Sequence, residues 1–299
     1  MAAAAVTFWA ASYIWAKTAL TWLHPIAASE VRYVISAVVL LAIAIPIGGL
    51  VAALRDNWRR YIVLGVVGIT FFQALLFIAL DYTTAVNASV IMALTPVLTM
   101  AGAAVFLGEP FGVRAGIGMV ISVAGALLAV LGDSPNGFAG LTLDRGEPLA
   151  LLGAGCMAFY TVASRRLMPT KEKTLINTAL VVGFGMVFLL PLSAFTEAPR
   201  TLPTWPVVVA LTGLTLGSTV LGYLFWTHAI KVLGVSEPNI LYNFIPVLTM
   251  IMASLLGTPP HTEQVIGALL VVAGVTLSIA PLGRDGTRPA GQTSAVTHH

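Results

Sequence analysis

The sequence predicts an all-α integral membrane protein with ten transmembrane helices in two inverted-topology five-helix repeats. The first observation is composition: of 299 residues, 58% are hydrophobic and 9% are charged, whereas a soluble domain carries roughly 25% charged residues. The second is a phrase, PVLTM, that begins at Pro96 and again at Pro246, 150 residues later (246 − 96). The third is that the apolar runs do not alternate with polar residues, as barrel strands would.

The two copies of this phrase lie in similar surroundings. The stretch ALDYTTAVNASVIMALTPVLTM at 79–100 aligns without a gap with AIKVLGVSEPNILYNFIPVLTM at 229–250. Downstream, GMVISVAGALLAV from Gly118 aligns with GALLVVAGVTLSI from Gly267. This period is too long for a solenoid repeat, so the sequence indicates two membrane-embedded halves.

A membrane-spanning helix needs about 20 mostly apolar residues, and ten segments qualify. The predicted spans are 4–22, 26–50, 61–80, 85–107, 113–132, 148–166, 175–195, 205–230, 238–257 and 263–281. Prolines, glycines and charges separate them, including the RDNWRR run at 55–60. The expected organisation is a first repeat at 1–132, an outer connecting loop at 133–147, a second repeat at 148–281 and a disordered cytoplasmic tail at 282–299.

Lysines and arginines in the loops predict the orientation, because cytoplasmic loops carry an excess of both. With a cytoplasmic N-terminus, only Arg145 and Arg200 fall in outer loops. Eleven fall inside: Arg55, Arg59, Arg60, Arg114, Arg165, Arg166, Lys171, Lys173, Lys231, Arg284 and Arg288. Five spans per half is an odd number, so the second half crosses the membrane in the opposite sense, as in many secondary transporters. We expect a multi-pass protein of the bacterial inner membrane with both termini cytoplasmic.

Pro96 and Pro246 fall near the middle of the fourth and ninth predicted spans. Proline removes a backbone donor and clashes with the carbonyl four residues earlier, so it kinks a helix. The released carbonyls, near Met92 and Tyr242, need a partner or a wet cavity. We therefore predict helix kinks that let these spans line a cavity. The alternative is that proline is simply common in membrane helices.

Polar and aromatic residues gather on particular faces of the predicted spans. Trp9, Ser12 and Tyr13 lie at positions i, i+3 and i+4, so they share one helical face. The same spacing recurs in span nine, at Asn239, Tyr242 and Asn243. A buried amide is costly unless it is hydrogen-bonded, so the two asparagines should face the interior. There they either line a substrate cavity or cross-link helices.

Charged side chains inside the spans are few and are expected near the span ends. Lys17 lies about a turn from the outer end of span one, and Glu30 and Arg32 lie near the outer start of span two, where they are expected to pair with it. No carboxylate and no basic pocket is expected at mid-membrane. Proton coupling through a buried acid and an anionic sugar or phosphate substrate are therefore unsupported. A neutral or zwitterionic, partly apolar solute fits aromatic and amide groups better.

The sequence contains no pattern for covalent chemistry. Cys156 is the only cysteine, which excludes an internal disulfide or a paired-cysteine metal site. No HExxH, phosphate-binding glycine loop or Ser/His/Asp set in a suitable context is present. We therefore predict no catalytic residue, no metal, no cofactor and no enzyme activity. The expected partners are a small-molecule substrate and the lipid bilayer, with no nucleic acid and a monomer favoured over a dimer.

Several segments resemble the drug/metabolite transporter superfamily, and within it the EamA-like ten-helix family. They are FWAASYIWAK at 8–17, EVRYVISAVVLL at 30–41, ALDYTTAVNASVIMALTPVLTMAGAAVFLGEP at 79–110 and SRRL at 164–167. The second half departs from the family's Leu-Gly-Glu ending, with GTPP at 257–260 where the first half has LGEP. Within the family, the chain looks most like amino-acid exporters, including those for aromatic amino acids.

The resemblance implies export of amino acids or related metabolites by alternating access, with spans one, three, four, six, eight and nine around a central cavity. The substrate-binding residues that it implies are Trp9, Tyr13, Gln73, Tyr82, Asn87, Tyr160, Tyr223, Asn239 and Asn243, and helical spacing adds Ser12 and Tyr242. Two alternatives stay open: a drug or nucleotide-sugar carrier of the same superfamily, and an integral-membrane lipid-modifying enzyme. The enzyme would need a His, Asp or Glu cluster near one interface, and the sequence shows none.

Overall fold

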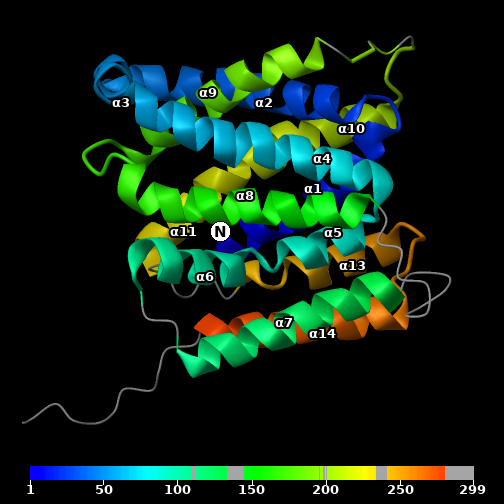
Figure 1. Cartoon of the computed structure of the whole chain (residues 1–299). Helices are drawn as coiled ribbons and strands as arrows, with labels where there is room; N and C mark the ends of the chain where they lie inside the picture. The colour runs from blue at the N-terminus through cyan, green and yellow to red at the C-terminus, as the bar shows by residue number, and fades with distance from the viewer. Residues whose placement is uncertain are drawn as a thin grey trace, which may run out of the picture.

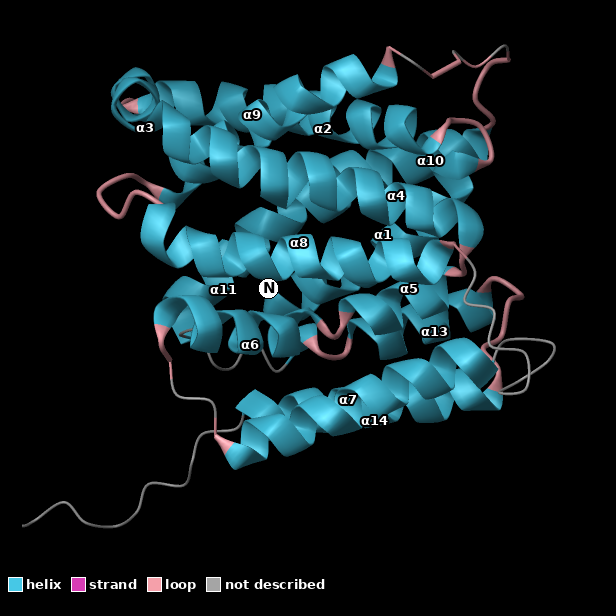
Figure 2. Cartoon of the chain, in the orientation of Figure 1, coloured by secondary structure: helices cyan, strands magenta, loops and turns pink. Residues whose placement is uncertain are grey.

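The computed structural model describes residues 1–109, 112–132, 145–194, 196–197, 199, 201–233 and 241–279. Every regular element in this part of the chain is helical (Figure 2). Up to residue 132 the elements are α1 (Ala2–Leu20), α2 (Pro25–Ala44), η1 (Ile45–Ile47), α3 (Leu50–Gly65), η2 (Val66–Phe71), α4 (Phe72–Tyr82), α5 (Ala85–Met92), α6 (Thr95–Leu107) and α7 (Val113–Gly132). From residue 145 they are α8 (Gly146–Leu167), α9 (Thr174–Ser193), α10 (Trp205–Thr212), η4 (Gly213–Leu221), α11 (Gly222–Leu233), α13 (Ile245–Leu255) and α14 (Thr262–Ile279).

Seven helical stretches are long and apolar enough to cross a membrane. They are Pro25–Ile47, Leu50–Tyr82, Ala85–Leu107, Val113–Val130, Gly146–Leu167, Thr174–Ser193 and Trp205–Trp226. Two further apolar helices, Ile245–Leu255 and Thr262–Ser278, are shorter. These and α1, of 19 residues, lie at the other three predicted spans. The described chain is therefore all-helical and has the composition of a membrane protein.

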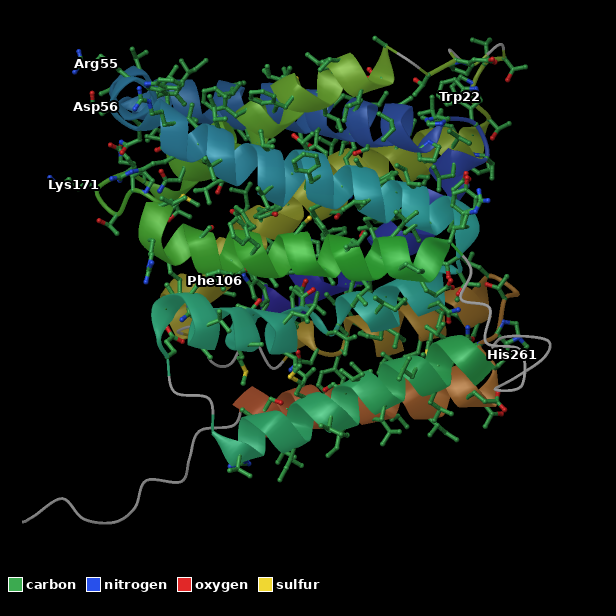
Figure 3. The ribbon with its side chains drawn as sticks, viewed as in Figure 1. Trp22, Arg55, Asp56, Phe106, Lys171 and His261 are labelled. Atoms are coloured by element: carbon green, nitrogen blue, oxygen red, sulfur yellow. The ribbon has the colours of Figure 1, made fainter. Side chains whose placement is uncertain are left out.

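The helices form one bundle, in which α7 and α14 pack along one edge and α2, α3 and α9 pack along the other (Figure 1). Between these edges, α1 packs against η4, α10, α11 and α13, whereas α8 packs against η2, α4, α5 and α6. Figure 3 shows Arg55 and Lys171 at one end of the bundle, and Trp22 and His261 at the opposite end. We call these the Arg55 end and the His261 end.

The RDNWRR run separates two helical segments, as predicted, although the residues on either side of the break are helical and not a loop. Within α3 (Leu50–Gly65), the backbone leaves helical angles at Asn57 (φ −132°, ψ 15°), so α3 consists of two helices joined at a kink inside the run. Leucine, alanine and arginine are good helix formers, and the charged side chains lie at the Arg55 end of the bundle, where charges reach water. The charged run therefore marks both the end of the apolar stretch and the boundary between two helices.

Both prolines of the repeated phrase follow an interruption in a helix. Pro96 is the second residue of α6, after a turn at residues 93–94, and Pro246 is the second residue of α13, after a turn at residues 243–244. Proline is well tolerated in the first turn of a helix. The Thr95 hydroxyl donates to the Met92 carbonyl at 2.7 Å, which gives a partner to the acceptor that Pro96 leaves unpaired.

The segments η2 and η4 are π-helical, and each joins an α-helix on either side. The helices that follow them, α4 and α11, begin at residues 72 and 222, which are 150 positions apart (222 − 72). π-Helical segments are rare and often occur at functional sites, because they change the register of the backbone hydrogen bonds. Neither π-helical segment was predicted from the sequence.

Helices α7 and α14 approach each other closely at glycines. An added Cβ at Gly118 would clash with the Gly274 carbonyl, and one at Gly125 would come within 2.6 Å of the Gly267 carbonyl. Two serine hydroxyls reinforce this contact: Ser122 Oγ donates to the Val271 carbonyl at 3.4 Å, and Ser278 Oγ donates to the Ala115 carbonyl at 3.2 Å. Small residues permit this close packing in membranes, where helices gain little from hydrophobicity alone.

Candidate functional site

Four aromatic side chains from distant parts of the sequence meet inside the bundle. The Trp9 ring of α1 lies 6.0 Å from the Tyr223 ring and 5.0 Å from the Trp226 ring of α11, measured between ring centroids. Tyr242, which precedes α13, lies 5.6 Å from Trp9 and 6.0 Å from Trp226. Most of these contacts are edge-to-face, the arrangement that the ring quadrupoles favour. We call these four residues the aromatic cluster.

The π-helical segment η4 holds the Trp9 indole in place. Trp9 Nε1 donates to the Ser218 carbonyl at 3.0 Å. At Gly222 an added Cβ would come within 2.9 Å of the same indole nitrogen, and at Gly217 one would lie 3.1 Å from the Phe8 ring. The absence of side chains at these two glycines therefore lets the aromatic face of α1 settle against η4 and α11.

A second polar group lies beside this cluster, around the Arg32 side chain of α2. Arg32 is 6% exposed. Its Nε donates to Thr219 Oγ1 at 2.9 Å, its Nη2 to Ser218 Oγ at 3.0 Å and its Nη1 to Gln73 Oε1 at 3.5 Å. We call Arg32, Gln73, Ser218 and Thr219 the Arg32 site. It links α2 and α4 to η4.

The Arg32 site contradicts two expectations from the sequence. Lys17 forms no ion pair with the start of α2, because its Nζ donates to the Leu80 carbonyl, and the interior does contain a basic group, Arg32. Arg32 lies about 10 Å along the axis from the first residue of α2 at a 1.5 Å rise per residue. It turns into the bundle because a guanidinium facing hydrocarbon is costly. The sequence did show a charged residue, Arg32, inside an apolar span. It was assigned to the outer interface, and its burial inside the bundle was therefore not predicted.

Ser218 joins the two groups, because its carbonyl accepts from Trp9 and its hydroxyl accepts from Arg32. The aromatic cluster and the Arg32 site therefore form one continuous candidate site, made of rings on one side and a cation on the other.

A cavity of about 490 Å³ leads toward this site from the Arg55 end. Its lining residues come from α2 and η1, from the start of α9 and from α11. They are Leu40, Ile47, Glu172, Lys173, Thr174, Leu175, Thr178, Tyr223, Leu224 and His228. Tyr223 belongs both to the cavity wall and to the aromatic cluster. His228 is exposed at this wall.

The remaining predicted site residues lie in several different places. Gln73 belongs to the Arg32 site. Ser12 Oγ donates to the Trp9 carbonyl of its own helix at 2.6 Å. Tyr13 is buried and lies one turn of α1 after Trp9. The sequence therefore placed these residues near the site, although Ser12 is engaged with its own backbone.

Other predicted residues lie apart from the aromatic cluster or outside the described chain. Tyr82 is 50% exposed at the end of α4. Asn87 accepts a 2.8 Å bond from Gln264 Nε2 of α14, a contact that links two helices. Tyr160 of α8 packs where Gly68 of η2 has no side chain, and it interacts electrostatically with Tyr223. Asn239 lies outside the described residues.

Asn243 is buried at 3% exposure, and its Nδ2 has no hydrogen-bond partner among the described residues. It lies in the turn before α13, next to Tyr242 of the aromatic cluster. An unsatisfied buried amide costs about 1–3 kcal/mol. Either a bound molecule or another state of the protein would offset this cost.

The structure adds Arg32, Ser218, Thr219 and Trp226 to the residues expected from the sequence. Serine and threonine are common as helix cross-links in membranes, and Trp226 lies close to the predicted end of a span, so none of these three stood out. No group of three or more His, Cys, Asp or Glu side chains suited to a metal occurs in the part of the chain that the structure describes.

Hydrogen bonds connect different elements of the bundle at both of its ends. At the His261 end, Trp22 Nε1 donates to the Thr201 carbonyl at 2.9 Å, and Thr83 Oγ1 donates to the buried Glu147 carboxylate. At the Arg55 end, Tyr61 donates to Asn177 Oδ1 at 2.7 Å. Arg165 also forms an ion pair with Glu109, which gives the Glu of LGEP a partner in α8.

Comparison with known proteins places this geometry in a family. The model of the EamA-like transporter family matches residues 1–131 and 144–280. The chain belongs to the EamA-like transporter family. Like its relatives in the drug/metabolite transporter superfamily, this EamA-like protein is therefore a membrane transporter and not an enzyme.

Individual relatives support this membership across most of the chain. The uncharacterized transporter YyaM of Bacillus subtilis (strain 168) is 35% identical over 272 residues, which cover 90% of this EamA-like chain and 88% of that protein. A probable terminal-alkyne amino-acid exporter of Streptantibioticus cattleyicolor is 27% identical, with 91% and 90% covered. A crystal structure of another protein has the same fold, with a TM-score of 0.66, 22% identity and 92% and 94% covered.

Proposed function

We propose that this EamA-like transporter is a secondary transporter that exports amino acids or related small metabolites across the bacterial inner membrane by alternating access. The observation that carries the proposal is the continuous site of aromatic rings and Arg32, which Tyr223 connects to the cavity. Its residues come from α1, α2 and α4 on one side and from η4, α11 and the segment before α13 on the other. Transporters built from repeats bind substrate where the halves meet.

The proposal includes ten spans in two inverted halves, residues 1–132 and 148–281. Corresponding features at a separation of about 150 residues support it. The prolines at 96 and 246 follow matching interruptions, and α6 and α13 end at left-handed glycines, Gly108 (φ 69°) and Gly257 (φ 84°). Helix α8 begins at Gly146, inside the proposed connecting loop 133–147, of which residues 133–144 lie outside the described residues. The proposed tail at 282–299 lies outside the described residues.

The pairing of helices supports the inversion as well. Gly118 aligns with Gly267 in sequence, and Gly125 aligns with Gly274. Exchanging the two halves therefore converts the Gly118–Gly274 contact into the Gly267–Gly125 contact, and both are present. Likewise, α1 packs against η4 and α13, whereas its counterpart α8 packs against η2 and α6. A two-fold exchange of this kind is what an inverted repeat requires.

The proposed substrate class rests on the chemistry of the site and on one relative. Four aromatic rings offer both an apolar surface and π-faces that attract an ammonium group. The relative from Streptantibioticus cattleyicolor is named as a probable amino-acid exporter. The cavity opens at the Arg55 end, which is cytoplasmic in the proposed orientation, so a cytoplasmic solute enters before export.

Uptake of labelled amino acids into proteoliposomes, with and without a pH gradient, tests this function. Saturable uptake above that of protein-free liposomes is the expected result. Uptake independent of the gradient would indicate a passive carrier, whereas gradient-driven uptake would indicate ion coupling; both agree with amino-acid transport. Absence of uptake for every amino acid tested would contradict the substrate assignment and favour the drug or nucleotide-sugar alternative.

A further inference from the structure

The Arg32 guanidinium is a buried cation whose described partners are all neutral. A guanidinium has five N–H donors and stays charged in proteins. The bonds to Thr219, Ser218 and Gln73 use three of them, and the Gln73 bond is long at 3.5 Å. The fork of donors that normally binds a carboxylate in bidentate fashion is thus only partly engaged.

Among the described residues, the ion pairs are Arg55–Asp56 and Arg165–Glu109, and both involve exposed side chains. Arg32, at 6% exposure, takes part in neither. A buried charge without a counter-ion is strongly unfavourable, and inside a membrane such a residue usually belongs to a pathway or binding site. In a transporter, the missing anion is naturally supplied by the solute.

The surroundings of Arg32 fit one class of solute. Ser218 connects Arg32 directly to Trp9, so the cation and the aromatic cluster are neighbours. Tyr223, whose ring lies 6.0 Å from the Trp9 ring, lines the cavity and gives the site a route to the bundle end. A carboxylate at Arg32 would leave the rest of the solute against the aromatic rings.

We propose that Arg32 binds the carboxylate of the transported solute, so that this transporter selects carboxylate-bearing solutes over their neutral amides. This assignment rests on the proposed function and narrows its substrate class. Ser218 and Thr219 orient the guanidinium, and Gln73 holds it from α4. An ammonium group or an apolar side chain on the solute then lies against Trp9, Tyr223, Trp226 or Tyr242.

A purely structural role for Arg32 is the competing explanation, because the Arg32 site also ties α2 and α4 to η4. A structural latch would affect all solutes equally, whereas a carboxylate site affects only those that carry the group. Matched pairs of ligands therefore separate the two roles. Suitable pairs are phenylacetate with phenylacetamide, and phenylalanine with phenylalaninamide.

The experiment measures binding of each pair to the purified full-length protein by tryptophan fluorescence and by ligand-dependent thermal stabilisation. The variants are Arg32→Gln and Arg32→Lys, with Arg55→Gln as an exposed control.

The wild type and the control should bind phenylacetate more tightly than phenylacetamide. Arg32→Gln should weaken phenylacetate binding about 10- to 100-fold, the scale of one charge-assisted hydrogen bond or more, and leave phenylacetamide nearly unchanged. Arg32→Lys keeps the positive charge but loses the bidentate guanidinium, so its affinity for phenylacetate should lie between those of the wild type and Arg32→Gln. If Arg32→Gln fails to fold, Arg32→Lys is the variant that tests the proposal.

Equal weakening of both ligands in Arg32→Gln would overturn the assignment in favour of a latch, as would a wild type without any preference for the carboxylate. Transport separates this failure from that of the proposed function. If carboxylate binding depends on Arg32 but no amino acid is transported in proteoliposomes, the Arg32 assignment stands and amino-acid export is contradicted. If amino acids are transported equally well by wild type and Arg32→Gln, export stands and the Arg32 assignment is contradicted.

Discussion

At the scale of single residues, Trp9 is the side chain with the most connections in the site. It contacts three other rings and donates to the Ser218 carbonyl. Ser218 is also the residue whose hydroxyl accepts from Arg32. A change at Trp9 therefore reaches both the aromatic surface and the support of the cation.

We predict that Trp9→Ala lowers the rate of transport by on the order of tenfold or more, because it removes ring contacts and a hydrogen bond of about 0.5–1.5 kcal/mol each. Trp9→Phe keeps a ring but not the donor, so it should have a smaller effect. Initial uptake rates in proteoliposomes at matched protein content measure this. Trp58→Ala is the control, since Trp58 is exposed and lies over Arg59; equal losses in Trp9→Ala and Trp58→Ala would contradict the site.

Substitution of Asn243 is expected to affect transport and thermal stability in different directions. Its buried Nδ2 has no described partner, so its loss removes a desolvation penalty of about 1–3 kcal/mol. We predict that Asn243→Ala keeps or raises the melting temperature in detergent while transport falls. Asn177→Ala is the comparison, because Asn177 bonds to Tyr61 and to the Pro169 carbonyl and its loss should lower stability. A lower melting temperature for Asn243→Ala with unchanged transport would refute the prediction.

Sequence reasoning located the rings of the site better than its polar partners. Trp9, Tyr223 and Tyr242 were expected from spacing and resemblance, and the structure brings them together. Arg32 was placed at an interface because its distance from the start of the apolar run is short, and that distance does not show which way the side chain turns. The Asn87–Gln264 bond joins positions 177 residues apart, and no local pattern predicts such a contact.

At the scale of elements, apolar length predicted the positions of helices, and the charged run predicted a boundary between two of them. Ala85–Leu107 has the predicted bounds. The RDNWRR run separates two spans as predicted, but it does so by a kink at Asn57 between two helices and not by a loop. The π-helical segments have no sequence signature of this kind, since they follow from packing against α1, α8 and α9.

The contact between α7 and α14 yields a prediction at this scale. Gly118→Ala and Gly267→Ala should destabilise the protein by similar amounts, because each places a Cβ against the backbone of the opposing helix. Overpacking of this kind typically costs about 1–3 kcal/mol. Gly155→Ala is the matched control, since nothing lies within 4 Å of its added Cβ. Melting temperatures in one detergent decide the matter, and a loss confined to one of the two variants would count against their equivalence.

At the scale of the whole molecule, the proposed inverted repeat predicts on which side of the membrane each residue lies. Residues at equivalent positions of the two halves must lie on opposite sides. Arg55 and Trp205 are such a pair, 150 residues apart (205 − 55) and both exposed. Lys171 lies at the same end of the bundle as Arg55, and His261 lies at the opposite end (Figure 3).

Single cysteines test this arrangement, because Cys156 is the only native cysteine and Cys156→Ser provides an unreactive background. We predict that a membrane-impermeant maleimide added to intact cells labels Trp205→Cys and His261→Cys, but labels Arg55→Cys and Lys171→Cys only after the membrane is opened. The reason is that lysines and arginines are retained on the cytoplasmic side. Labelling of Arg55→Cys and Trp205→Cys from the same side would indicate a parallel duplication. In that case the exchange of glycine contacts between α7 and α14 would need another explanation.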